Sequence, residues 1–198
     1  MERRVLPSLA VVLTCALAGC AHEEPLPPPD VLPPDAQSMP ESGRFVLTGI
    51  RNPIVALVTP TGIQGPDVNL GRYPDPSGAT SWRGTAFGRD VNLTIKADAA
   101  DGIVARSPFN LNVTPAPDGM VVNGLIGGLP STVTISKSRI NGAFGRCGYD
   151  IRFQGQAYVG PRNCGAAITQ VGLTLPTLLA TWPDAEVATV LSLMLSGR

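Results

Sequence analysis

The sequence predicts a mainly β fold: an antiparallel meander of hairpins forms a sandwich or barrel-like sheet, and one C-terminal α-helix packs on it. Three observations predict this class. From about residue 41, short runs of alternating apolar and polar residues are separated by glycine, proline and asparagine, which is the signature of strands and turns. A four-residue motif recurs beside two of these runs, and the last sixteen residues contain residues typical of the start and the end of a helix.

The alternation is clearest in VNLTI, residues 91–95, and FNLNV, residues 109–113, where apolar side chains alternate with asparagine or threonine. Because successive side chains of a strand point to opposite faces, one face of each strand is expected to be buried and the other wet. Ten strands are expected on this pattern, at 45–48, 54–59, 80–87, 91–97, 109–114, 120–126, 131–136, 139–144, 149–158 and 167–175.

The recurring motif is AFGR, at residues 86–89 and again at 143–146, with a looser copy in NGLIGG at 123–128. Glycine permits positive φ, so each copy is expected to form a strand, a tight turn and a return strand. The repeat therefore favours a meander of hairpins. A set of equivalent ligand-binding turns on one rim of the sheet stays open as a second interpretation.

The C-terminal residues predict one helix over 183–196. Pro183 suits a helix start, Asp184 and Glu186 fall in the first turn, and Gly197 lies near the end. The apolar residues at helical spacing are expected to pack on the sheet: Val187, Val190, Leu191, Met194 and Leu195. The uncharged part, residues 187–197, is too short to span a membrane.

The N-terminus has the layout of a cleaved export signal over residues 1–19. Arg3 and Arg4 precede an apolar stretch at residues 5–18, and small residues precede a cysteine. The stretch has fourteen residues and contains Pro7, whereas a spanning helix needs roughly 20 apolar positions. It is therefore expected to be a signal peptide and not a membrane span.

Residues 17–20, Leu-Ala-Gly-Cys, resemble the lipobox of bacterial lipoproteins. This resemblance implies diacylglycerol on the Cys20 sulfur, cleavage before Cys20, and usually a further acyl chain, such as palmitate, on the new amino group. In that family the residue after the cysteine sorts between membranes, and Ala21 implies the outer membrane, on the side of the periplasm or the cell surface. An ordinary signal peptide with a chance cysteine is the alternative.

After the lipid anchor, residues 20–40 are expected to form a tether. Seven of the sixteen positions from 25 to 40 are proline, and such a run favours extended polyproline II. Residues 41–198 show no second break in composition, and their length suits a single domain with one core.

Two cysteines remain for the folded domain once Cys15 leaves with the signal and Cys20 is acylated. Cys147 and Cys164 are expected to pair, because exported chains oxidise their leftover thiols. The bridge would close a loop of about 17 residues and stabilise the domain by about 3 kcal/mol.

The middle of the domain is basic, with nine basic and five acidic residues between positions 81 and 165. Arginine forks suit carboxylates and phosphates, so Arg89, Arg146 and Arg152 form a candidate anionic-ligand face. A solvated sheet face is the alternative. Nucleic acid is not an expected partner, because aromatic residues, which provide stacking platforms, make up only 5% of the chain.

Histidine chemistry is not expected in the folded domain, because the single histidine is His22, inside the tether. Serine and cysteine triads and histidine-ligated zinc all need a positioned imidazole. Asp101 and Asp118 each precede glycine and are interpreted as turn residues. No catalytic residue, metal or cofactor is predicted.

The expected function is that of a lipid-anchored cell-envelope lipoprotein. Its β-rich domain would be non-catalytic and would serve a structural or partner-binding role, with an envelope protein or an anionic glycan as partner. The alternative is a carrier of lipid or another apolar ligand, suggested by the apolar stretch at 168–195. A carboxylate-dependent enzyme is the third hypothesis.

Overall fold

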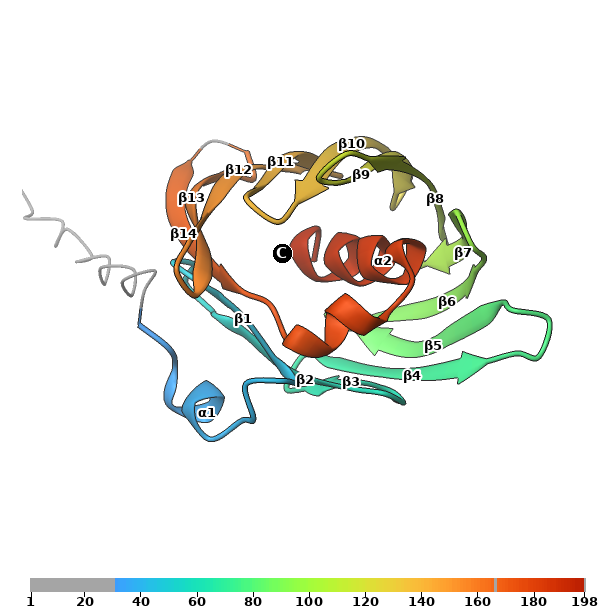
Figure 1. Ribbon diagram of the computed structural model, residues 1–198, viewed down its shortest axis with the longest axis horizontal. Helices are drawn as coiled ribbons and strands as arrows, with labels where there is room; N and C mark the ends of the chain where they lie inside the picture. Colours follow the sequence, from blue (N-terminus) through green and yellow to red (C-terminus); the bar gives the residue numbers. More distant parts are fainter. Residues whose placement is uncertain (1–30, 166, 198) are drawn as a thin grey trace, which may run out of the picture.

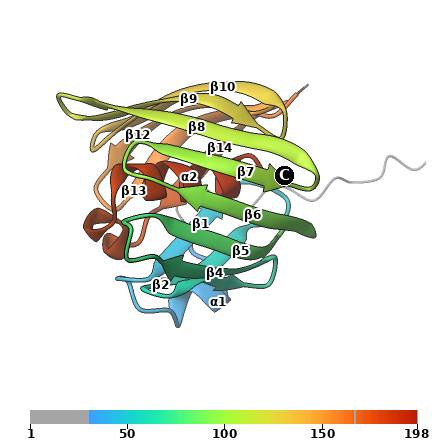
Figure 2. The ribbon, with the colours of Figure 1, turned by 90° about the vertical axis from the view of Figure 1, so that its right-hand side faces the viewer.

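Antiparallel strands close into one barrel in the computed structural model, which describes residues 31–165 and 167–197. Figure 1 looks into the ring of strands and Figure 2 shows it from the side. Within the described residues, fourteen strands each pair with their neighbours in sequence, and β1 pairs with β14 to close the ring. The predicted mainly β meander is therefore confirmed, and it is a barrel.

The strands are β1 Arg44–Thr48, β2 Ile54–Thr59, β3 Gly62–Gly65, β4 Val68–Pro74, β5 Thr80–Ala86, β6 Arg89–Ile95, β7 Ala99–Val104, β8 Ser107–Ala116, β9 Gly119–Ile126, β10 Leu129–Ser136, β11 Arg139–Phe144, β12 Cys147–Gln154, β13 Ala157–Asn163 and β14 Ile168–Thr174. The helical segments are α1 Pro34–Gln37, the 3-10 turn η1 Thr177–Thr181 and α2 Asp184–Leu195.

Because the hairpins alternate in direction, their turns gather at two opposite rims of the barrel. The proximal rim carries the turns at 60–61, 75–79, 96–98, 117–118, 137–138 and 155–156, and α2 begins beside it. The distal rim carries the turns at 66–67, 87–88, 105–106, 127–128 and 145–146, and α2 ends beside it.

The barrel is apolar inside and polar outside. On β6, Val91, Leu93 and Ile95 are buried, while Asn92 and Thr94 are exposed between them. The same alternation runs along β8 and β10. This is the arrangement of an antiparallel sheet with one face on a core and the other in water.

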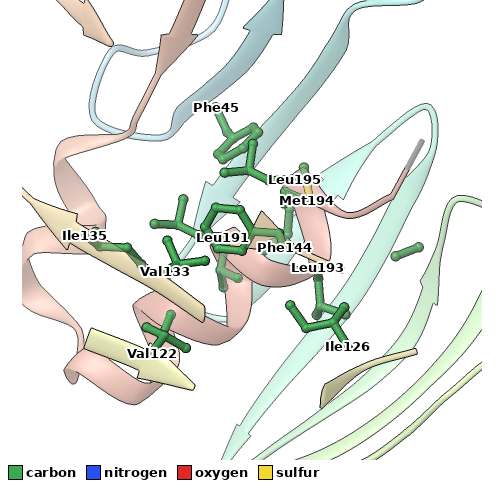
Figure 3. Close-up of a cluster of buried hydrophobic side chains, with 14 of the residues drawn as sticks. Phe45, Val122, Ile126, Val133, Ile135, Phe144, Leu191, Leu193, Met194 and Leu195 are labelled. Carbon is green, nitrogen blue, oxygen red and sulfur yellow. The ribbon is translucent and has the colours of Figure 1, made fainter. Parts of the chain in front are cut away.

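The C-terminal helix α2 fills the barrel, which explains why it is buried on almost every side. Its bounds match the predicted helix to within one residue at each end, and ten of its twelve residues are buried. Figures 1 and 2 show it inside the ring of strands. In Figure 3, Leu191, Leu193, Met194 and Leu195 lie among side chains from β1, β9, β10 and β11.

An ion pair fixes the first turn of α2 to the wall. Glu186, with a side chain 3% exposed, accepts hydrogen bonds from Arg72 Nε at 2.6 Å and Arg72 Nη2 at 3.0 Å. Thr80 Oγ1 donates a third, at 2.9 Å. The Arg72 guanidinium also lies 5.1 Å from the centre of the Trp182 ring. The start of the helix is thus held by charged contacts and not by packing alone.

Six glycines, one on each alternate strand from β3 to β13, let neighbouring strands approach closely. At Gly102, φ is 151° and an added Cβ would lie 2.2 Å from the carbonyl oxygen of Asn92 on β6. The other five share this geometry, with φ between 132° and 157°: Gly62, Gly84, Gly124, Gly142 and Gly160. Glycine kinks of this kind are a known way to coil a sheet into a barrel.

Several strand predictions were wrong in detail. The short β3, with glycine at both ends, and the longer β4 were missed. So was β7, because Asp101-Gly102 was interpreted as a turn, whereas both residues lie within the strand and pair with Asn110 and Phe109. The strand expected at 149–158 is divided between β12 and β13 by a turn at Gly155, where φ is 73°. Asp118 does lie in a turn, as predicted.

The tether is not extended throughout. Residues 34–37 form one helical turn, α1, with Pro34 at its first position and Asp35 in its first turn, and Ala36 is fully buried. Proline is well suited to the first position of a helix, so this part of the proline-rich segment packs on the barrel and does not continue as polyproline II. The signal peptide at 1–19, Cys20 and residues 20–30 lie outside the described residues.

Among the residues that the structure describes, no helix has both the length and the hydropathy needed to cross a bilayer.

Candidate functional site

The repeated AFGR motif supplies two turns of the distal rim. In the first copy, Phe87 and Gly88 form the turn, with φ of 52° and 70°. In the second, Phe144 ends β11 and is buried, and Gly145, at φ 61°, forms the turn with Arg146. The hairpins expected from the repeat are therefore confirmed, and the motif is shifted by one residue between them.

These turns surround a pocket of about 460 Å³ at the distal rim, called here the distal pocket. It contains Gly127 from the third copy of the repeat, so all three copies converge on one site. Its lining consists of Ala86, Arg89, Val104, Ile126, Gly127, Leu129, Gly145, Arg146, Cys147, Cys164, Leu193 and Ser196.

Arg89 reaches into the distal pocket from the start of β6. It has the same parity along the strand as the buried Val91 and Leu93, so it lies on the inner face of the barrel. Its Nη2 donates to the carbonyl oxygen of Gly197 at 2.9 Å. A cation at this position complements the negative end of the α2 dipole, and a guanidinium has further N–H donors to offer.

Arg146 lies in the turn itself and is exposed. No hydrogen bond or ion pair joins its side chain to another described residue. Arg146 therefore lines the distal pocket, and its guanidinium has no partner in the described part of the chain.

Arg152, the third residue of the predicted anionic-ligand face, does not join the other two. On β12 the buried residues are Cys147, Tyr149 and Ile151, so Arg152 points to the outer face. On that face, Arg139 Nε donates a hydrogen bond of 2.7 Å to Asp150 Oδ1, and this bond is the main cause that lowers the pKa of Asp150. The positive charge of Arg152 lowers the same pKa further. The structure thus brings Arg89 and Arg146 together and leaves Arg152 on the outer wall.

A buried arginine that was treated only as part of the basic stretch lies behind the pocket. Arg162 on β13 pairs with Tyr149 in register and points inward. Its Nε donates to Tyr149 Oη at 2.9 Å, and that hydroxyl donates to the carbonyl oxygen of Leu195 at 2.8 Å. Burial raises the pKa of Tyr149, and the positive charge of Arg162 opposes this. The pair holds the last turn of α2.

The cysteine pairing predicted from the exported context is present. Cys147, the first residue of β12, is bonded to Cys164, just after β13, and both line the distal pocket. Arg162 Nη2 lies 3.5 Å from Cys147 Sγ. The bridge therefore fixes one wall of the pocket. The predicted lipidation site, Cys20, lies outside the described residues.

The carboxyl groups show no raised pKa where a shift is resolved. Hydrogen bonds from Ser77 lower the pKa of Asp75, and Arg139 lowers that of Asp150. General-acid catalysis by a carboxyl group needs a shift in the opposite direction. Within residues 31–165 and 167–197, no three side chains of histidine, cysteine, aspartate or glutamate gather as a metal site.

No family model, curated protein or solved structure matches this chain. The distal pocket offers two guanidinium groups, an apolar wall and a fixed disulfide, a combination suited to a small ligand that carries a carboxylate or a phosphate.

Proposed function

We propose that this chain is a lipid-anchored, non-catalytic binding module of the bacterial cell envelope, and that its distal pocket holds the acidic group of an anionic glycan. The observation that carries the proposal is the convergence of Arg89 and Arg146, from two copies of one motif, on a single pocket. Two guanidiniums facing one cavity can clamp a carboxylate or phosphate through charge-assisted hydrogen bonds.

The volume of the distal pocket supports a small-molecule group as the ligand. At about 460 Å³ it falls in the range of about 300–1,000 Å³ that is common for ligand pockets. Gly127 and Gly145 contribute no side chains to its mouth, which leaves room for a sugar ring. A flat protein partner would instead use the outer wall.

The anchor part of the proposal rests on the Leu-Ala-Gly-Cys motif at 17–20. Several acyl chains on Cys20 would hold the barrel at a membrane surface, because one chain alone binds only marginally. The non-catalytic part is supported by the position of His22 and by the lowered pKa values of Asp75 and Asp150.

The pocket can be tested by calorimetric titration of the full chain with galacturonate, and with galactose as the neutral counterpart. We expect galacturonate to bind and galactose to bind at least tenfold more weakly. Arg146→Gln should weaken galacturonate binding by a similar factor, since a charge-assisted contact contributes about 1.5–3 kcal/mol. Arg152→Gln, on the outer wall, is the matched control and should change nothing.

Equal binding of the two sugars, or equal losses in the two arginine variants, would reject the proposal for the distal pocket. The anchor is tested separately. Mass spectrometry of the natural N-terminus should find an acylated Cys20 as the first residue, and Cys20→Ala should release the protein from the membrane fraction. An unmodified sulfur would reject the anchor and leave the pocket untouched.

A further inference from the structure

A second pocket, of about 480 Å³, opens at the proximal rim, at the other end of α2. It lies between α2, η1 and the wall formed by β9, β10 and β13, and is called here the proximal pocket. Its lining consists of Pro117, Asp118, Gly119, Met120, Ile135, Ser136, Lys137, Tyr158, Leu175, Pro176, Leu179, Ala180, Trp182, Asp184, Val187 and Leu191. It shares no residue with the distal pocket.

The inner part of the proximal pocket is hydrocarbon. Met120 and Ile135 form one wall and Leu191 the opposite one. Val187 lies only half-buried on α2, where the helix does not fill the barrel. The one polar group of Tyr158 is already used, since its hydroxyl donates to the carbonyl oxygens of Ser136 and Lys137 at 3.0 and 3.2 Å. Such a wall gains free energy by covering apolar surface.

Charged side chains surround the mouth of the proximal pocket. Lys137 comes from the turn between β10 and β11, Asp118 from the turn between β8 and β9, and Asp184 from the start of α2. All three are exposed. None makes a side-chain hydrogen bond or an ion pair with another described residue. The mouth thus presents one cation and two carboxylates around an apolar interior.

This pattern of charge defines the complementary ligand. A fatty acid would satisfy Lys137 and face the two carboxylates with a like charge, whereas a neutral hydrocarbon would use none of the three. A head group with one phosphate and one ammonium satisfies both signs, because opposite charges across an interface select partner and orientation. A volume in the lower half of the usual range for ligand pockets, about 300–1,000 Å³, suits one acyl chain and not two.

We propose that the proximal pocket binds a zwitterionic phospholipid with a single acyl chain. The chain lies between α2 and β9–β10 beside Val187, Lys137 binds the phosphate, and Asp118 and Asp184 bind the ammonium group. This site is separate from the distal pocket, and it gives the apolar-ligand hypothesis a location at the barrel mouth and not in the lumen, which α2 occupies.

The test titrates the full chain with lysophosphatidylethanolamine below its micellar concentration. Phosphoethanolamine, which lacks the chain, and lysophosphatidylglycerol, which lacks the ammonium, serve as comparison ligands. We expect the first ligand to bind, phosphoethanolamine to give no detectable binding, and lysophosphatidylglycerol to bind at least tenfold more weakly. A brominated acyl chain should quench tryptophan emission, because Trp182 lines the pocket.

Variants that change only the exposed charged residues at the mouth test the proposal without altering the packing of the core. Lys137→Glu should weaken lysophosphatidylethanolamine binding at least tenfold, and Asp118→Asn combined with Asp184→Asn should remove the preference over lysophosphatidylglycerol. Lys96→Glu and Asp98→Asn are matched controls, because both residues are exposed in another turn of the same rim and do not line the pocket. Val187→Trp should block entry of the acyl chain into the proximal pocket.

Three outcomes would overturn the proposal: equal losses in Lys137→Glu and Lys96→Glu, binding of phosphoethanolamine as strong as that of the lysolipid, or no preference between the two lysolipids in the unmutated chain. If Val187→Trp fails to fold, the surface charge variants still decide. Arg146→Gln should leave lysolipid binding unchanged, so the result is independent of the proposed glycan site.

Discussion

Single hydroxyl and carboxylate groups inside the barrel determine where α2 sits. The Tyr149 hydroxyl bridges Arg162 and the carbonyl oxygen of Leu195 at the distal rim, and Glu186 joins Arg72 and Thr80 at the proximal rim. A buried polar group without its partner is costly. These two contact sets therefore fix the position of the helix along the barrel, which apolar packing alone specifies poorly.

Tyr149→Phe should destabilise the protein by about 1–3 kcal/mol, because it leaves Leu195 O and Arg162 Nε without this buried partner. Urea unfolding monitored by circular dichroism measures the loss. Tyr158→Phe is the control, since the Tyr158 hydroxyl lies nearer the surface, and it should cost less. Equal losses would show that the bridge has no special role.

The same hydroxyl predicts an alkaline effect. Burial raises the pKa of Tyr149 in the folded protein above its ordinary value of 10.0. The contribution of the protonated Tyr149 hydroxyl to the free energy of unfolding is therefore complete below pH 10. It is lost as the pH rises through the higher pKa of the folded state. Unfolding titrations should show a decline above pH 10 that is smaller in Tyr149→Phe, and an identical decline in both proteins would contradict the assignment.

Glu186→Gln should cost about 3–5 kcal/mol, because it removes the buried anion that faces Arg72. The ion pair between Arg139 and Asp150 gives the contrast, since both side chains are more than 40% exposed. Exposed pairs contribute little, so Asp150→Asn should leave the unfolding midpoint nearly unchanged. A mild effect of Glu186→Gln would mean that water reaches the Arg72 guanidinium.

At this scale the sequence predicted which residue types matter but not which face of the sheet their side chains occupy. Arg89, Arg146 and Arg152 all belong to the basic stretch, yet only strand parity separates the inward Arg89 from the outward Arg152. Arg162 lies outside the strand expected at 149–158, so its pairing with Tyr149 was also missed.

At the scale of elements, the glycines on alternate strands form the clearest repeat in the chain. They fall at positions 62, 84, 102, 124, 142 and 160, so successive members are separated by 18 or 22 residues. All six lie on strands of one direction; five of them, from Gly84 to Gly160, have inward-facing parity, whereas Gly62 lies beside the inward Ile63. Each unit of the repeat is one hairpin, and the two AFGR copies lie at two of its turns.

Gly102→Ala should destabilise the barrel by more than about 3 kcal/mol, because a φ of 151° strains an L-residue and the new Cβ would meet Asn92 O at 2.2 Å. Gly88→Ala is the control. Its φ is 70°, but no atom lies within 4 Å of the added carbon, so it should cost about 1 kcal/mol. Thermal unfolding of both variants compares them, and similar midpoints would contradict a packing role.

Most strands with clear alternation could be predicted, and a glycine within the strand did not by itself prevent this. The expected ranges at 54–59 and 139–144 match β2 and β11 fully, although only β2 alternates without a break and β11 contains Gly142. The missed β3, β4 and β7 also contain glycine, which usually weakens a strand, but so do the predicted β5, β9 and β11. In β3 and β7 the close approach of the neighbouring strand requires Gly62 and Gly102, although glycine normally argues against a strand.

On the scale of the whole molecule, closure and filling depend on each other. β1 and β14 meet across 124 residues, with Thr48 Oγ1 donating to the carbonyl oxygen of Gly172 at 3.1 Å. The sequence could predict a meander but not this closure, because pairing of the first and last strands leaves no local pattern. It also predicted α2 on the sheet, since an apolar helix gives no sign of being surrounded by strands.

Deletion of residues 183–198 should leave a collapsed sheet without fixed packing, because the inward side chains of the strands would lose the helix that they contact. We expect loss of the near-ultraviolet circular dichroism of the Trp82 and Trp182 pair, whose rings lie 5.5 Å apart, together with binding of a hydrophobic dye. A peptide of residues 183–198 added in trans should restore both signals.

The matched control for this deletion is Ala36→Gly together with Pro34→Ala in α1, which alters a helix outside the barrel and should leave the near-ultraviolet spectrum intact. A shortened chain that unfolds sharply, binds no dye and keeps its spectrum would mean that the strands form a stable barrel around an empty lumen. In that case α2 would be a removable plug, and the lumen itself, and not its two mouths, would be the place to look for a ligand.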